Sequence, residues 1–123
     1  MTISEAIAKV DALKPNTYKP EEKVSWLSTL DWMIKREILD VSAVNPSEDF
    51  NGYDCNTPLD TVLIAQAPYD ELYIRYLEAQ IDYYNGELTR YANSMSMFNS
   101  LYNGYTKWYG RNNPPKARKL VFW

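Results

Sequence analysis

Few residues in this sequence have types and spacing suited to catalysis. The 123 residues include no histidine and a single cysteine, so the chain cannot supply a Ser-His or Cys-His nucleophile pair. Carboxylates occur in adjacent pairs: Glu21-Glu22, Glu48-Asp49 and Asp70-Glu71. Adjacent side chains on a helix point in different directions, so such pairs do not make an acid and base couple. With four glycines and none in the spacing of a phosphate-binding loop, we expect no enzyme and no cofactor.

Metal binding has one partial signal. Segment 47–52, Ser-Glu-Asp-Phe-Asn-Gly, has the oxygen-bearing spacing of the first half of a calcium loop, yet Pro58 stands where that loop requires a bidentate glutamate. Cys55 has no second cysteine and no histidine with which to bind zinc. The sequence therefore predicts no metal site.

Tyrosines on a helical stripe are the most distinctive polar residues of the chain. Of the eleven tyrosines, nine lie between Tyr69 and Tyr109. Apolar positions there follow one another at alternating spacings of three and four: Ile74, Leu77, Ile81, Tyr84, Leu88, Tyr91, Met95, Phe98, Tyr102, Tyr105 and Tyr109. This period places them on one helical face. Tyrosines beside basic residues can stack on single-stranded nucleic acid, but the helical spacing favours packing in a core or an interface.

The N-terminal part predicts two amphipathic helices. Thr2 and Glu5 have the spacing of a capping box, which starts a helix at residue 3, and Pro15 ends it. Pro20 suits a first helical turn, so a second helix is expected over about 20 to 40. Segment 41–68 lacks helical periodicity and reads as a long loop. Residues 61 to 65 within it could form one short strand, which needs a partner from this chain or the next.

The long C-terminal helical region has two interpretations at Asn85-Gly86. A glycine costs about 1 kcal/mol in a helix interior and commonly follows a helix end, so the chain could turn there into an αα-hairpin. Because the apolar stripe keeps its phase across Gly86, we favour one continuous helix over about 69–109 with a kink. Such a helix would be roughly 60 Å long and would need other chains to cover it. The fold is thus predicted as all-α, with one helical domain over 1–112 and a tail over 113–123.

Charge is unevenly distributed along the chain. Residues 1–70 carry 12 acidic and 6 basic side chains, residues 71–123 carry 4 and 7, and no acid follows Glu87. This asymmetry fits either ordinary surface charge or attraction between the two ends of neighbouring subunits in a head-to-tail ring. The net charge of −3 disfavours strong nucleic-acid binding. With no apolar run near the roughly 18 residues of a membrane span and no signal peptide, we expect a soluble, unprocessed protein.

The sequence ends on four consecutive large apolar residues, Leu120, Val121, Phe122 and Trp123. Chain ends seldom expose such a run, so something must cover it. Another chain and the core of the same chain are both compatible with the sequence.

Several stretches of the sequence carry a family resemblance: Phe50-Asn51-Gly52-Tyr53-Asp54, Thr57-Pro58-Leu59-Asp60-Thr61, Pro68-Tyr69-Asp70-Glu71-Leu72-Tyr73, Tyr76-Leu77-Glu78-Ala79-Gln80-Ile81-Asp82 and Met97-Phe98-Asn99. With most of residues 3 to 112, they are similar to small proteins encoded among the head genes of tailed phages and prophages of Firmicutes. Those proteins resemble head-to-tail connector, or adaptor, proteins. The motifs are structural and contain no catalytic signature.

The resemblance implies a helical structural protein that forms a ring of copies on the portal protein, extends the DNA channel and meets a tail or stopper protein. It would be made in the bacterial cytoplasm and reside in the virion, with DNA passing through without specific binding. The expected interface residues are Tyr91, Met95, Phe98, Tyr102 and Tyr105 on the long helix, and Leu120, Val121, Phe122 and Trp123 in the tail. The alternative is a helical protein-binding or regulatory module that acts as a small oligomer.

Overall fold

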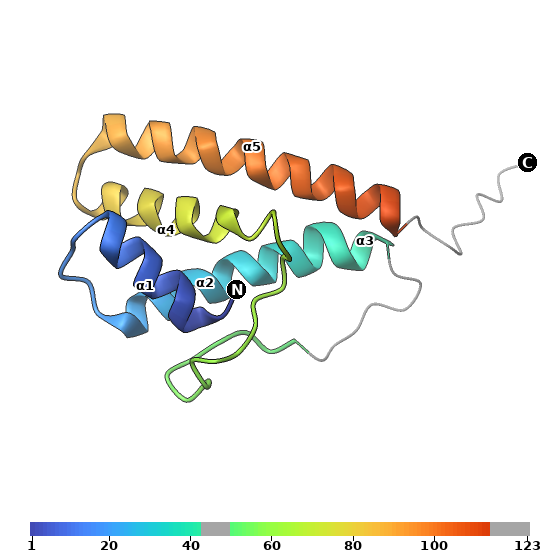
Figure 1. Cartoon of the computed structure of the whole chain (residues 1–123), viewed down its shortest axis with the longest axis horizontal. Coiled ribbons are helices and arrows are strands. Elements are labelled where there is room, and N and C mark those ends of the chain that lie inside the picture. Colours follow the sequence, from blue (N-terminus) through green and yellow to red (C-terminus); the bar gives the residue numbers. More distant parts are fainter. Residues whose placement is uncertain (43–49, 114–123) are drawn as a thin grey trace, which may run out of the picture.

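The computed structural model describes residues 1–42 and 50–113 (Figure 1). Its helical elements are α1 (Ile3–Leu13), α2 (Pro20–Ile34), the π-helical turn η1 (Lys35–Leu39), α3 (Asp40–Ser42), α4 (Glu71–Tyr84) and α5 (Leu88–Asn112). No strand occurs within these two ranges, and the all-α prediction is confirmed.

The predicted capping box opens α1. The Thr2 amide donates to the Glu5 carboxylate at 2.9 Å, and the Glu5 amide donates to the Thr2 hydroxyl at 3.2 Å. The short strand considered for residues 61 to 65 is reduced to one antiparallel bridge between Thr2 and Val62. The segment therefore pairs with the N-terminus of the same chain. The Leu63 amide, for example, donates to the Met1 carbonyl at 2.9 Å, so the backbone of the segment is already hydrogen-bonded within the chain.

The second predicted helix is present as a continuous run from Pro20 to Ser42. Pro20 lies in its first turn, where the missing proline amide costs nothing. The run contains one wider π turn, η1, across which Lys35 Nζ binds both carboxylate oxygens of Asp40 at 3.0 and 3.1 Å.

The favoured continuous helix over 69–109 is wrong, and the hairpin alternative is correct. Helix α4 ends at Tyr84, α5 begins at Leu88, and Gly86 between them has a left-handed φ of 76°. The apolar spacing seemed to continue across Gly86 because each of the two helices of the hairpin has its own apolar face toward the core. The residues that seemed to carry the stripe across the turn, Tyr84 and Leu88, are 58% and 67% exposed.

Helix α4 is the centre of the bundle. It lies between α5 on one side and α1 and α2 on the other (Figure 1), and it contacts all three. The covering that a 60 Å helix would have needed from other chains thus comes from the chain itself. The fully buried side chains of α4 include Leu72, Tyr73, Leu77 and Ile81.

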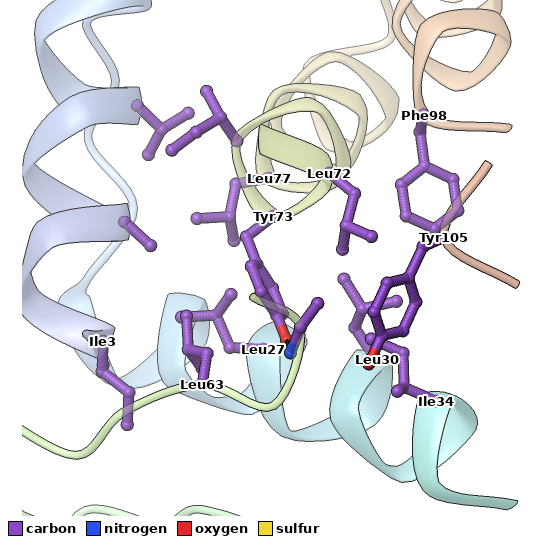
Figure 2. Packing of buried hydrophobic residues seen from close by; sticks show 14 of the residues in the cluster. Ile3, Leu27, Leu30, Ile34, Leu63, Leu72, Tyr73, Leu77, Phe98 and Tyr105 are labelled. Atoms are coloured by element: carbon purple, nitrogen blue, oxygen red, sulfur yellow. Dashed lines mark hydrogen bonds between the residues drawn. The ribbon is translucent and has the colours of Figure 1, made fainter. Parts of the chain in front are cut away.

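The inward face of α5 completes the core. Phe98 and Tyr105 point from α5 toward Leu72 of α4 and Leu30 of α2 (Figure 2), and they are 4% and 2% exposed. Both residues were predicted at an interface with another chain. The structure corrects this, because folding back at Gly86 lays them against their own α4 and α2.

Candidate interaction surface

The turn between α4 and α5 carries large apolar residues into solvent. The backbone closes α4 with paired hydrogen bonds, Glu87 amide to Asp82 carbonyl at 2.9 Å and Gly86 amide to Tyr83 carbonyl at 3.1 Å. This pattern requires a left-handed residue, which Gly86 supplies. As a result Tyr83, Tyr84 and Leu88 protrude at one end of the bundle, and each is more than half exposed.

A pocket of about 330 Å³ lies beside this turn. Its lining residues are Tyr18, Glu22, Ser25, Trp26 and Tyr84. The Trp26 and Tyr84 rings are almost parallel, at 7°, with centroids 5.7 Å apart. The Tyr18 ring meets Trp26 edge-on, at 64° and 5.7 Å, so aromatic rings bound the pocket with a carboxylate beside them.

Polar contacts hold Tyr18 in the linker between α1 and α2. The Tyr18 hydroxyl donates to Asn85 Oδ1 at 2.7 Å, which ties the linker to the α4–α5 turn. The Tyr18 carbonyl accepts from Lys23 Nζ at 3.1 Å, and Lys23, 2% exposed, also binds Asp11 at 2.7 Å. Because these contacts come from separate elements, the pocket wall is fixed before any partner arrives.

A buried ion pair fixes the helix hairpin close to its turn. Asp82 of α4 is fully buried and binds Lys14 Nζ at 2.5 Å. Its second oxygen accepts from the Ser94 hydroxyl of α5 at 3.1 Å. One carboxylate therefore joins the end of α1, the last turn of α4 and the second turn of α5.

The aromatic surface continues past the pocket along α5. Tyr83 packs on Tyr84 with ring centroids 5.2 Å apart and on Tyr91 at 5.4 Å. We call this surface the aromatic end of the bundle; it comprises Tyr18, Trp26, Tyr83, Tyr84, Leu88 and Tyr91. Tyrosine and tryptophan are the residues that protein interfaces favour, because they combine a large apolar area with a hydrogen-bonding group.

Charges at the two ends of the bundle are left unpaired. Glu21 and Glu22 are exposed beside the pocket, in the first turn of α2, and make no ion pair within 1–42 and 50–113. The last turns of α5 lie at the opposite end of the bundle (Figure 1). Lys107 and Arg111 in these turns are exposed and likewise have no acidic partner among the described residues. The first turn of α2 and the last turns of α5 thus offer opposite charges.

The structure separates the interface residues predicted on the C-terminal helix. Tyr91 belongs to the aromatic end, whereas Met95 is partly buried against the core next to Phe98. Tyr102 is partly buried, and its hydroxyl donates to a Glu37 carboxylate oxygen at 2.6 Å. Burial, with the hydrogen bond to Glu37, raises the pKa of Tyr102 above its usual range. The tail residues Leu120, Val121, Phe122 and Trp123 lie outside the described ranges.

Sequence reasoning missed Tyr18, Trp26, Tyr83 and Tyr84 as surface residues. The continuous-helix interpretation placed Tyr84 on the apolar stripe and left no turn beside Tyr83, which hid the exposure of both side chains. The Asn85-Gly86 turn signal was the available clue, because a turn there ends the stripe and releases both side chains to solvent.

A second polar cluster lies in the interior, around Asp31 of α2. Its carboxylate is fully buried and accepts hydrogen bonds from the hydroxyls of Tyr73, at 2.6 Å, and Tyr53, and from the Ile64 amide at 3.2 Å. The Tyr73 hydroxyl in turn accepts from the Ala65 amide at 2.7 Å. The cluster joins α2, α4 and the loop, and each carboxylate oxygen of Asp31 already has a partner. We therefore assign it a structural role.

The remaining chemical possibilities find little support in the parts of the chain that are described. We find no group of three or more histidine, cysteine, aspartate or glutamate side chains placed to hold a metal ion within residues 1–42 and 50–113. None of the helices there combines the length and apolarity that crossing a bilayer requires. No protein-family model, curated protein or solved structure matches the chain.

Proposed function

We propose that this protein is a structural head-to-tail connector of a tailed phage or prophage, which assembles as a ring of copies on the portal protein. The sequence resemblance supports the phage assignment. The aromatic end supports assembly. A single 60 Å helix that other chains would have to cover no longer does so, because the chain folds into a hairpin at Gly86.

The observation that carries the proposal is the exposure of the aromatic end. Tyr83, Tyr84 and Leu88 are 53%, 58% and 67% exposed and lie together at one end of the bundle. A contiguous apolar surface of this kind is costly in water and typical of a site that another protein covers. Without histidine the chain cannot form a Ser-His or Cys-His nucleophile pair, which suits a structural role.

In this proposal the bundle is one segment of a ring that extends the DNA channel below the portal. The weakly acidic chain would let DNA pass without binding it. A tail or stopper protein would meet the ring on the side away from the portal, and the site of action would be the virion after synthesis in the bacterial cytoplasm.

Light scattering coupled to size exclusion tests the proposal directly. The full-length chain is measured over a wide concentration range, alone and with the portal protein from the same genome. A self-assembled ring, or a monomer that enters a large complex only with the portal, supports a connector. Electron microscopy of the complex would then show whether the added density is a ring on the portal.

A fixed dimer that ignores the portal would overturn the connector proposal. That result would favour the alternative, a small binding or regulatory module that uses its aromatic surface for a partner helix.

A further inference from the structure

We propose that the pocket of Tyr18, Glu22, Trp26 and Tyr84 receives a basic side chain, Lys107 or Arg111, from the end of α5 of a second copy. This inference rests on the proposed assembly of copies and names the contact that joins them.

The pocket has the composition that recognises an ammonium or guanidinium group. The three rings lie within 6.4 Å of one another, centroid to centroid, and Tyr18 stands at a steep angle to the near-parallel Trp26 and Tyr84 rings. Aromatic faces attract cations through their quadrupole, with tryptophan the strongest. Glu22 adds a full negative charge at the edge, and no ion pair within the described ranges neutralises it.

The cation does not come from the same copy. Lys107 lies nineteen residues beyond Leu88 on the same helix, which places it about 28 Å from the turn along the helix axis. Three cations of the same copy lie closer to the pocket along the chain: Lys23 is buried against Asp11, Arg90 faces Glu87 at 3.5 Å, and Lys19 is exposed at the N-cap of α2. None of them lines the pocket.

The far end of α5 offers the complementary group. Lys107 and Arg111 are exposed and one helical turn apart, so their side chains share a face. Helix α5 contains no acidic residue, so no neighbour on the helix competes for them. Opposite charges at the two ends of one molecule favour contact between unlike ends of successive copies.

The geometry of this contact is head-to-tail. The pocket lies beside the α4–α5 turn, and the basic residues lie in the last turns of α5. Figure 1 shows that the turn and the end of α5 are at opposite ends of the bundle. One contact therefore leaves a free pocket on one copy and free cations on the other. Where the copies meet end to end, repetition of such a contact produces a closed ring or an open filament.

Charge reversal in the full-length chain tests the pairing. Glu22→Lys should raise the protein concentration needed for half-maximal assembly at least about tenfold, and so should Lys107→Glu combined with Arg111→Glu. All three changes together should recover part of the loss, because the charges are then exchanged. The matched control is Glu21→Lys, which makes the same charge change in the same helical turn but does not line the pocket.

Cysteine cross-linking tests the direction of the contact. In a Cys55→Ser background, Ser25→Cys marks the pocket and Lys107→Cys marks the end of α5. A short bismaleimide should link a mixture of the two proteins and neither protein alone. Asp60→Cys, exposed on the loop and not among the pocket residues, serves as the control that should not link.

The outcomes separate this contact from the function on which it rests. The contact is overturned if Glu22→Lys and Glu21→Lys weaken assembly equally, or if the Ser25→Cys protein links to itself. Either result leaves the connector proposal standing. A wild-type chain that stays monomeric with and without the portal overturns both. Circular dichroism of each variant confirms that the helical fold is retained.

Discussion

At the scale of single residues, the buried Asp31 carboxylate makes the stability of the fold depend on pH. Burial raises the pKa of Asp31 above its usual range, although the hydroxyls of Tyr53 and Tyr73 and the Ile64 amide donate hydrogen bonds that favour the ionised form. A carboxyl with a raised pKa in the folded state contributes stability that is full below its unfolded pKa, about 4, and is lost as pH rises through the folded pKa.

We therefore expect the free energy of unfolding of wild type to fall, relative to Asp31→Asn, as pH rises from about 4. Urea unfolding at a series of pH values measures this difference. Asp60→Asn, which replaces an exposed acid on the loop, is the control for the loss of one carboxylate. A difference that stays constant with pH would contradict the burial effect.

Gly52 lies where the backbone of the loop passes close to α2. A Cβ built at this position would lie 2.7 Å from both Ser28 Oγ and Trp32 Nε1, and Gly52 has a left-handed φ of 78°. The neighbouring Tyr53 amide donates to Ser28 Oγ at 2.9 Å, so the loop cannot move away without losing that bond. Only glycine fits both the space and the backbone conformation.

We predict that Gly52→Ala lowers the free energy of unfolding by about 2 to 4 kcal/mol, from steric overlap and left-handed strain together. Chemical denaturation measures the loss. Gly104→Ala is the control, because its Cβ would meet only ordinary contact, at 3.5 Å from Tyr69, and it should not destabilise. Equal stability of the two variants would show that the loop is not held against α2.

At the scale of elements, the α4–α5 turn depends on the conformation of Gly86. Its φ of 76° suits glycine, although a Cβ added there would have no neighbouring atom within 4 Å, so the cost of a side chain is purely conformational. Gly86→Ala should therefore cost about 1 to 2 kcal/mol. A continuous helix would instead gain stability from the same change.

The matched control for Gly86→Ala is Gly110→Ala. Gly110 lies inside α5 with open space around it and no left-handed φ, so alanine there should add about 0.5 to 1 kcal/mol. Thermal unfolding of the two variants should move in opposite directions. A gain at Gly86 would contradict the hairpin.

At the scale of the whole molecule, we expect substitutions at the aromatic end to weaken assembly while leaving folding largely unchanged. Replacing both Tyr84 and Leu88 with serine removes apolar surface that is mostly exposed in a single copy, so the free energy of unfolding should fall by no more than about 1 kcal/mol. Assembly alone or with the portal should weaken at least about tenfold, measured by light scattering. The control is Val62→Ser, which removes an equally exposed apolar side chain (68%) from the loop and should leave assembly unchanged.

The sequence by itself determined the features that local interactions control. The capping box of Thr2 and Glu5 and the proline at position 20 act within one helical turn, so the starts of α1 and α2 could be predicted from them. The helical class followed from periodicity in the same way.

Tertiary structure decided whether the stripe formed one helix or two, and which of its residues reach solvent. Gly86 is compatible with either outcome locally, and the choice depends on what α5 gains by packing Phe98 and Tyr105 against residues more than twenty positions away. The aromatic end likewise depends on tertiary packing, because the contact of α2 with α4 brings Tyr18 and Trp26 to Tyr84. Such contacts join residues far apart in the chain, so their energies are not visible in the spacing of neighbours along it.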